Sequence, residues 1–297
     1  MAWLLGLFLT DTLLSVNSLG SVVGPSVWWI SALSSALPDI QTREELEREI
    51  FSNLAFGELF REHFERLPSL EGKRVLEIGS GAGQESVLFA LNGAEVVGYD
   101  KRSTAIRDAY SLAEQFGVRE QCTFEVAQVD QLPDDENSFD LVFSKSVLQY
   151  TDRPRVIAEC IRVLKPGGTL LMIENTPYNP FVNFSRFVRR LKARESDMVY
   201  LRTIKGYLHC SEARGVVGEL DGGTYRCMHV LTPPIIFMTW SSKLGKLPLL
   251  GLGYRVLRAI DKVLLGIIPP LRHLAWIGCM QGNKQNPAQG SEGDHAS

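Results

Sequence analysis

Cysteine is scarce in this chain, and none of it follows a metal-binding spacing. The 297 residues include five cysteines, at Cys122, Cys160, Cys210, Cys227 and Cys279. An odd number of cysteines with no Cys-x-x-Cys pair offers neither a zinc-ligand set nor a disulfide framework. The pattern predicts no metal site, and it favours a reducing compartment, the cytoplasm, over secretion.

An excess of positive charge is also missing. Lysine and arginine total 31, aspartate and glutamate total 34, and the net charge is therefore −3. A nucleic-acid-binding protein usually carries a basic face and a high pI, so we expect no nucleic-acid partner. One local basic cluster is interpreted as a solvated helix face, with an anionic-substrate or lipid patch as the alternative. It comprises Arg186, Arg189, Arg190, Lys192 and Arg194.

The N-terminal segment lacks basic residues altogether. Residues 1–42 contain no lysine or arginine, whereas a secretory signal begins with a positive region. The apolar stretch Leu13–Leu37 is long enough to span a membrane, but Asn17, Gly20, Gly24, Pro25 and several serines dilute it. We expect residues 1–41 to be an apolar extension that packs on the protein or caps a substrate. Peripheral membrane contact through residues 1–37 is the alternative.

Residues 42–71 are predicted to form a helical lead-in. Thr42 and Glu45 have the spacing of a capping box, which satisfies two free amides at a helix start. Aromatic residues then recur at helical spacings and predict an amphipathic helix packed on the next domain, with an aromatic lid over a ligand as the alternative. These aromatics are Phe51, Phe56, Phe60 and Phe64.

Residues 72–176 alternate between strand and helix patterns. Alternation of this kind predicts βαβ units, a parallel sheet and ligands at the carboxyl ends of its strands. The predicted strands are Arg74–Ile78, Glu95–Tyr99, Cys122–Val126, Phe139–Phe143 and Thr169–Ile173. The predicted helices are Gln84–Leu91, Ser103–Phe116 with Ser103 as its cap, and Val156–Val163.

The C-terminal part has a weaker pattern. Residues 177–280 are expected to hold a substrate-capping region and the final strands of the sheet, and residues 281–297 a disordered polar tail. Within the first of these parts, Phe181–Lys192 has the pattern of a basic amphipathic helix, and Pro233 is typical of a first helical turn. Leu274–Met280 is predicted as a last strand.

The most informative run is Glu77-Ile78-Gly79-Ser80-Gly81-Ala82-Gly83, which joins a buried strand to a helix. Alternate glycines let the backbone turn tightly and approach a ligand closely. A dinucleotide fingerprint would place its third glycine at position 84 or 86, where Gln84 and Ser86 stand. A carboxylate at the strand end suits an ammonium group better than a pyrophosphate. Asp100, 21 residues after Gly79, ends the second strand, where a carboxylate can accept both hydroxyls of a ribose.

Several motifs together resemble the class I S-adenosylmethionine (SAM)-dependent methyltransferases, in the subgroup named methyltransferase type 11. They are VLEIGSGAG (75–83), VVGYD (96–100), QVDQLPDDENSFDLVFSKSVLQY (128–150) and RVLKPGGTLLMIE (162–174). The resemblance implies an α/β, Rossmann-like, doubly wound fold. Its sheet would have seven mostly parallel strands with helices on both faces, flanked here by apolar N- and C-terminal extensions.

The resemblance also implies roles for individual residues toward SAM as cofactor. Glu77 and the loop residues Gly79, Ser80, Gly81 and Gly83 would hold the methionine end. Asp100, with Lys101 beside it, would hold the ribose. Asp130 would accept from the adenine amino group with Gln131 near the base, and Ser144 would line the pocket by the sulfonium.

The sequence departs from the resemblance where many relatives carry a histidine, because Gln149 and Tyr150 stand there. The catalytic residues are therefore left open. Each candidate for a general base also has an ordinary structural role available to it. The candidates are Tyr150, Glu174, Tyr178, His209 and His229.

The predicted function is transfer of a methyl group from SAM to a small-molecule or lipid-like acceptor. The two apolar ends of the chain would then form a cap over a hydrophobic acceptor. The alternatives are a catalytically inactive SAM-binding scaffold and, against the glycine spacing, a nicotinamide-dependent dehydrogenase. The expected location is cytoplasmic, with membrane association as an open addition, and the sequence leaves the acceptor atom and the oligomeric state open.

Overall fold

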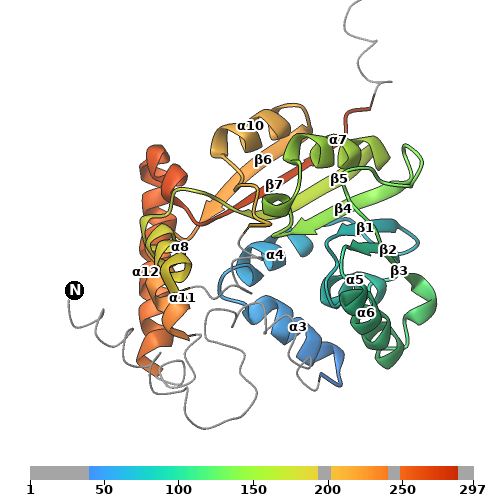
Figure 1. The fold of residues 1–297 in the computed structure, drawn as a ribbon, viewed down its shortest axis with the longest axis horizontal. Coiled ribbons are helices and arrows are strands. Elements are labelled where there is room, and N and C mark those ends of the chain that lie inside the picture. The colour runs from blue at the N-terminus through green and yellow to red at the C-terminus, as the bar shows by residue number, and fades with distance from the viewer. Residues whose placement is uncertain (1–39, 193–201, 240–247, 287–297) are drawn as a thin grey trace, which may run out of the picture.

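A seven-stranded sheet forms the centre of the computed structural model, which describes residues 40–192, 202–239 and 248–286 (Figure 1). The strand order is β3-β2-β1-β4-β5-β7-β6. Strands β1 to β5 are parallel to one another, whereas β7 runs antiparallel to both β5 and β6. The strands are β1 (Arg74–Ile78), β2 (Glu95–Asp100), β3 (Cys122–Val126), β4 (Phe139–Lys145), β5 (Leu164–Asn175), β6 (Asp221–Met228) and β7 (Ile277–Asn283). The predicted mostly parallel, Rossmann-like sheet is confirmed.

Helices cover both faces of this sheet and bury two separate apolar clusters. One cluster joins α3, α4, α5 and α6 to the sheet, and the other joins α7 and α10 to the opposite face (Figure 1). The helices are α3 (Arg43–Ser52), α4 (Gly57–Phe64), α5 (Gln84–Ala90), α6 (Ser103–Gln115), α7 (Arg153–Val163), α8 (Pro180–Lys192), α10 (Cys210–Gly218), α11 (Pro233–Thr239) and α12 (Pro248–Ile267). Short 3-10 turns are η2 (Arg119–Gln121), η3 (Leu148–Tyr150) and η4 (Pro269–Leu274).

The lead-in forms two helices rather than one. The capping box of Thr42 and Glu45 starts α3, as expected. The helix then ends at Ser52, and a second helix, α4, begins at Gly57. Phe60 is fully buried, with its ring 5.0 Å from that of Phe143 and 6.0 Å from that of Phe89, measured between centroids. The aromatic residue at the centre of this lead-in is therefore part of the core, and not a lid.

Several predictions about local structure were wrong. Ser103 does not cap α6. Arg102 is the N-cap residue, and its amide donates to Asp100 Oδ1 (2.9 Å). Residues 281–283 belong to β7 rather than to a disordered tail, since Gln281 pairs with Leu171 and Asn283 with Thr169. Helix α10 and strand β6 had no counterpart in the predictions.

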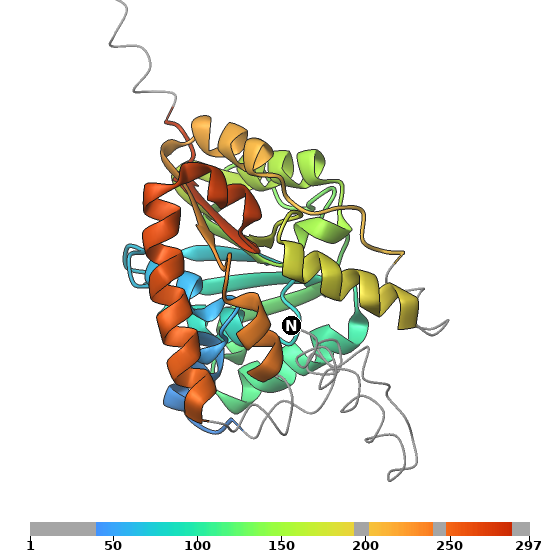
Figure 2. The ribbon, with the colours of Figure 1, turned by 90° about the vertical axis from the view of Figure 1, so that its left-hand side faces the viewer.

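Helices α8, α11 and α12 lie together at the β6 end of the molecule, as Figures 1 and 2 both show. Helix α11 contacts both of the others, and the rings of Phe181 on α8 and Phe237 on α11 are 5.6 Å apart. Among the described residues, no helix is long and apolar enough to cross a membrane. Residues 1–39 of the N-terminal extension, on which the predicted cap or membrane contact depends, lie outside the described residues.

Candidate active site

The predicted ligand-binding residues gather at the carboxyl edge of the sheet. In the register of the strands, Ile78 at the end of β1 pairs with Tyr99 on β2 and Ser144 on β4. The glycine loop, Asp100, Lys101 and the turn after β4 therefore emerge side by side. This is the place where open α/β sheets bind their ligands.

The glycines of the loop after β1 all have positive φ angles, of +71° at Gly79, +53° at Gly81 and +79° at Gly83. Their surroundings differ. A Cβ at Gly79 would collide with Val147, and one at Gly83 would lie 2.8 Å from Ala109 Cβ. At Gly81 the closest atom to a Cβ would be Arg102 Nη2, 4.0 Å away. Gly79 and Gly83 are thus required by the packing of the protein, whereas Gly81 borders open space.

Glu77 is a buried carboxylate at the end of β1. Its Oε2 accepts a hydrogen bond from Ser86 Oγ (2.5 Å) on α5. Burial, together with the nearby carboxylate of Glu85, raises the pKa of Glu77 well above its usual value. Glu85 itself forms an ion pair with Lys145. A cation bound beside Glu77 would oppose both effects on its pKa, so the carboxylate suits a ligand with an ammonium group.

Two polar side chains of the loop region have hydrogen-bonding capacity left. Asp100 accepts from the amides of Gly81 (3.1 Å) and Arg102 (2.9 Å) and from Arg102 Nε (3.2 Å). A carboxylate offers about four lone-pair sites, so one acceptor site remains. Ser80 Oγ is buried and, within the described residues, has no hydrogen-bond partner. A buried hydroxyl without a partner is rare in native proteins and fits a site that a polar ligand completes.

The predicted adenine and ribose contacts lie at the side of the loop. Asp130 is half-buried and Gln131 is exposed, four and five residues after β3 ends. Lys101 is exposed at the end of β2, with its Nζ 5.1 Å from the centroid of the Tyr150 ring. The structure brings Lys101 and Tyr150 together, a contact that no sequence pattern predicts.

Ser144 is completely buried and donates to Glu174 Oε1 (2.7 Å). Glu174 also accepts from the amides of Val147 (3.1 Å) and Leu148 (3.2 Å). Burial raises the pKa of Glu174 to about 7 despite these hydrogen bonds. Glu174 thus fixes the turn after β4. Ser144, bonded to Glu174, acts on the predicted site indirectly, by way of that turn.

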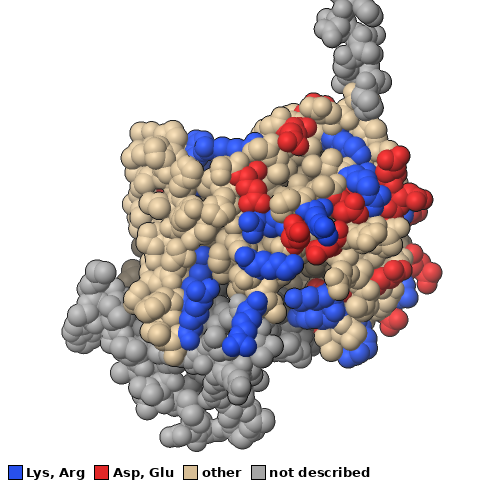
Figure 3. Space-filling model, turned by 45° about the horizontal axis from the view of Figure 1, so that its top comes forward, with Lys and Arg blue, Asp and Glu red and all other residues tan. Residues whose placement is uncertain are grey.

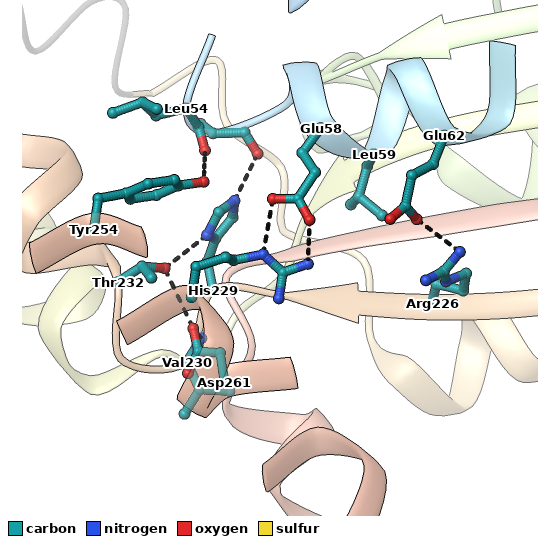
Figure 4. Close-up of polar contacts among 12 residues, drawn as sticks. Leu54, Glu58, Leu59, Glu62, Arg226, His229, Val230, Thr232, Tyr254 and Asp261 are labelled. Carbon is teal, nitrogen blue, oxygen red and sulfur yellow. Dashed lines mark hydrogen bonds and ion pairs between the residues drawn. The ribbon is translucent and has the colours of Figure 1, made fainter. Parts of the chain in front are cut away.

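His229, one of the candidate bases, belongs to a buried polar network away from the loop (Figure 4). Its Nδ1 pairs with Thr232 Oγ1 (2.6 Å) and its Nε2 with the carbonyl of Ala55 (3.1 Å). Burial, with the positive charge of Arg258 nearby, lowers the pKa of His229 to about 3. The imidazole is therefore a neutral structural link between the lead-in and the end of β6.

We expect replacement of His229 by asparagine to destabilise the protein in a pH-dependent way. Asparagine tolerates the positive φ of this position (+69°) but cannot bridge Thr232 and Ala55. The lowered pKa means that stabilisation by neutral His229 is complete above pH 6.5, the ordinary pKa of histidine, and is lost as the pH falls toward 3. Urea unfolding should show a deficit of about 2 kcal/mol or more at pH 8 that narrows by pH 5. A deficit of the same size at both pH values would contradict this account.

Two other candidate bases come together. Tyr178 OH lies 3.0 Å from His209 Nδ1, with the rings in an edge-on contact, and Tyr178 is 46% exposed. The two residues are 31 positions apart. The amide of Leu208 donates to the carbonyl of Asn175 (3.2 Å), which places His209 beside the end of β5. The amide of Lys205 donates to the carbonyl of Gln149 (2.8 Å), so this segment also borders the position where the resemblance led us to look for a histidine.

Comparison with known proteins gives consistent matches. Residues 69–199 match a family model described as a methyltransferase domain. The chain is 29% identical to a ubiquinone biosynthesis O-methyltransferase of Chromobacterium violaceum over 230 residues, 71% of this chain and 88% of the relative. It is 30% identical to the protein of the same name from Coxiella burnetii, over 66% of this chain and 74% of the relative.

Among solved structures, the fold is similar to that of geranyl diphosphate C-methyltransferase from Streptomyces coelicolor, which was determined with Mg²⁺, geranyl diphosphate and S-adenosylhomocysteine. The TM-score is 0.53 at 15% identity, over 84% of this chain and 89% of that one. At this identity the likeness concerns the fold alone.

Proposed function

The chain belongs to the class I SAM-dependent methyltransferases, and from that premise we propose that it methylates a hydroxyl oxygen of a small hydrophobic acceptor. The observation that carries the proposal is the contact between Tyr178 and His209 at the carboxyl edge of the sheet. A phenol that donates its hydrogen bond to an imidazole nitrogen can pass its own proton to that nitrogen while it accepts the proton of an acceptor hydroxyl. The names of the relatives, which specify O-methyl transfer in ubiquinone biosynthesis, support the same chemistry.

We assign the cofactor to the residues that the loop geometry offers. Glu77 would accept from the ammonium group, Asp100 from a ribose hydroxyl and Asp130 from the adenine amino group. The unpartnered Ser80 Oγ and the open space at Gly81 fit a ligand that lies directly on the loop. When bound, SAM supplies a methyl group that its sulfonium already activates.

The protein's own side chains would orient the acceptor and accept its proton. Tyr178 and His209 would orient the acceptor hydroxyl and take its proton as the oxygen gains the methyl group. Glu174 would position the turn after β4 through the amides of Val147 and Leu148. Because the donor is activated, correct positioning and one proton acceptor are sufficient for this chemistry.

The preference for a hydrophobic acceptor is inferred from the side chains beside the pair. Helix α8 begins two residues after Tyr178 and carries Phe184 and Phe187, which are both half-exposed. Arg186 of the same helix lies over the ring of Tyr207, 3.6 Å from its centroid, and so holds α8 against the segment that bears His209. An apolar acceptor tail could pack on these rings.

Three matched probes test the proposal. Purified enzyme and SAM with a deuterated methyl group would be incubated with a phenol that bears an octyl tail, with the same phenol lacking the tail, and with the octyl aniline. Mass spectrometry should show labelled methyl ether from the tailed phenol, with much less product from the other two. Predominant methylation of the aniline would refute the hydroxyl specificity. SAM binding without transfer, to these probes or to a cell extract, would favour a scaffold.

We expect Asp100→Ala to weaken SAM binding by about tenfold or more, because hydrogen bonds to a charged acceptor contribute about 1.5–3 kcal/mol. Calorimetric titration with SAM would measure the effect. Asp108→Ala on α6 is the matched control, since it removes an exposed carboxylate away from the loop. An Asp100 variant that binds SAM as tightly as this control would refute the assignment to the ribose.

A further inference from the structure

Helix α12 exposes a continuous apolar stripe on its outer side. The stripe residues are spaced three or four positions apart, which places them on one face of the helix. Each is between 41% and 76% exposed. They are Leu249, Leu252, Val256, Ile260, Val263 and Ile267.

Two polar side chains of α12, those of Tyr254 and Asp261, point the other way, into the protein (Figure 4). Arg258 forms a two-pronged ion pair with Glu58 on α4, with N–O distances of 2.8 and 2.9 Å. Asp261 is fully buried and accepts from the amides of Val230 (3.1 Å) and Leu231 (2.9 Å). Tyr254 donates to the carbonyl of Leu54 (3.3 Å). These inward-pointing contacts prevent α12 from rotating about its axis, and they therefore keep its apolar stripe on the outer side.

Helix α8 lies on the same side of the molecule as α12 (Figure 2) and carries a second exposed apolar stripe. Phe184, Phe187 and Leu191 follow one another at helical spacing and are 50% to 71% exposed. Helix α11 lies between α8 and α12 and contacts both. Apolar patches of this extent on a protein surface usually mark an interaction site.

The charges beside the stripes all have one sign. Arg255 and Lys262 flank the stripe of α12 and are exposed, as is Arg190 on α8. Across the described helices α8, α11 and α12, the single acidic residue is Asp261, which is buried. Figure 3 shows the side where α12 lies as mostly uncharged with scattered Lys and Arg, whereas Asp and Glu gather on the opposite side.

We propose that this face, formed by the outer stripes of α8 and α12, binds to the surface of an anionic lipid bilayer. Apolar side chains bordered by basic ones, with no exposed acid, complement a layer of acyl chains beneath negative headgroups. Neither helix would span the membrane. Both would lie in its interface, with α12 anchored to the protein by Arg258 and Asp261. The proposal does not depend on the role of residues 1–37. It shares Phe184 and Phe187 with the proposed acceptor site, so its test uses the stripe of α12, which has no part in that site.

Vesicle flotation tests the apolar part of this proposal with the full chain. Wild-type protein should float with vesicles of phosphatidylcholine and phosphatidylglycerol, and the variant L252S/V256S/V263S should float at least about tenfold less. Val126→Ser is the control, because Val126 on edge strand β3 is 57% exposed, as is Val263 of the stripe. Unchanged SAM affinity in each variant would show that the fold and the cofactor site are intact.

A charge-reversal pair tests the electrostatic part. R255E/K262E should lose most of its binding to the anionic vesicles, and so should wild-type protein on vesicles of phosphatidylcholine alone, because each basic residue near an anionic surface contributes about 1 kcal/mol. R48E/R107E, which changes exposed arginines on α3 and α6, is the matched control and should bind normally. Full flotation of both stripe variants, or the absence of flotation by wild type, would overturn the proposal. The proposal would also be overturned if the wild-type protein were a dimer in solution and both stripe variants were monomers, because a second copy of the chain would then cover the face.

Discussion

Replacing Gly81 by valine is expected to abolish SAM binding while the protein stays folded. Among the described residues, a Cβ at this position would meet no atom closer than 4.0 Å, so the side chain would extend into the space beside the loop. That space is where we place the cofactor. We expect the affinity for SAM to fall by at least about 100-fold, equivalent to about 2.7 kcal/mol. Calorimetry with S-adenosylhomocysteine as well as SAM would show whether the loss concerns the whole ligand.

The control for this prediction has to share the backbone strain. A non-glycine residue in the left-handed region costs about 1–2 kcal/mol, which corresponds to a few degrees of melting temperature. Gly72 has a similar φ of +65°, and a Cβ there would also meet nothing within 4 Å, but it precedes β1 at the other end of the strand. Gly72→Val should therefore lose stability as Gly81→Val does and still bind SAM. Equal SAM binding by the two variants would contradict the loop assignment.

The central sheet was predictable because its signals are local. Strands β1 and β3 begin and end at the predicted residues, since each is a short run of apolar residues between polar or glycine-containing turns. Strand β6 gives no such signal. It starts Asp221-Gly222-Gly223 and buries fully only Met228, so it is a strand because β7 pairs with it. Pairing of that kind depends on tertiary structure, which sequence periodicity does not contain.

In the candidate site, too, some residues are predictable from local sequence signals and others depend on tertiary structure. The glycine loop and Asp100 follow from the spacing of residues around one strand-to-helix turn. By contrast, Ser144 and Glu174 come from different strands, and their hydrogen bond became evident only once β4 and β5 were placed side by side. Ser86 as partner of Glu77 was also missed, although its place in the first turn of the following helix was a usable signal.

The contact of Tyr178 with His209 is a further case that the sequence could not supply. Both residues were candidates, but nothing in the chain between them predicts that α10 begins beside the end of β5. Their proximity changes the interpretation of Gln149 and Tyr150. A histidine absent from one segment can be replaced by a histidine from another, provided that both segments border the same edge of the sheet.

This replacement leads to the prediction with the largest expected effect on turnover. Removing the imidazole in His209→Gln should lower kcat by about 10²–10⁴-fold, the usual contribution of a general base. Tyr178→Phe should lower it as well, because the hydroxyl that contacts His209 Nδ1 is lost. If the two act as a unit, the double variant should be hardly slower than His209→Gln alone. SAM affinity should be unchanged in all three, since neither residue belongs to the glycine loop.

A merely structural role for His209 would give different results. His209 is the N-cap residue of α10, but its side chain makes no capping hydrogen bond, so the glutamine variant should keep its melting temperature. His273, an exposed histidine on η4, provides the matched control, and His273→Gln should retain wild-type kcat. A variant that loses stability and SAM binding together with turnover would remove His209 from the chemistry and leave the base to be sought elsewhere along the carboxyl edge.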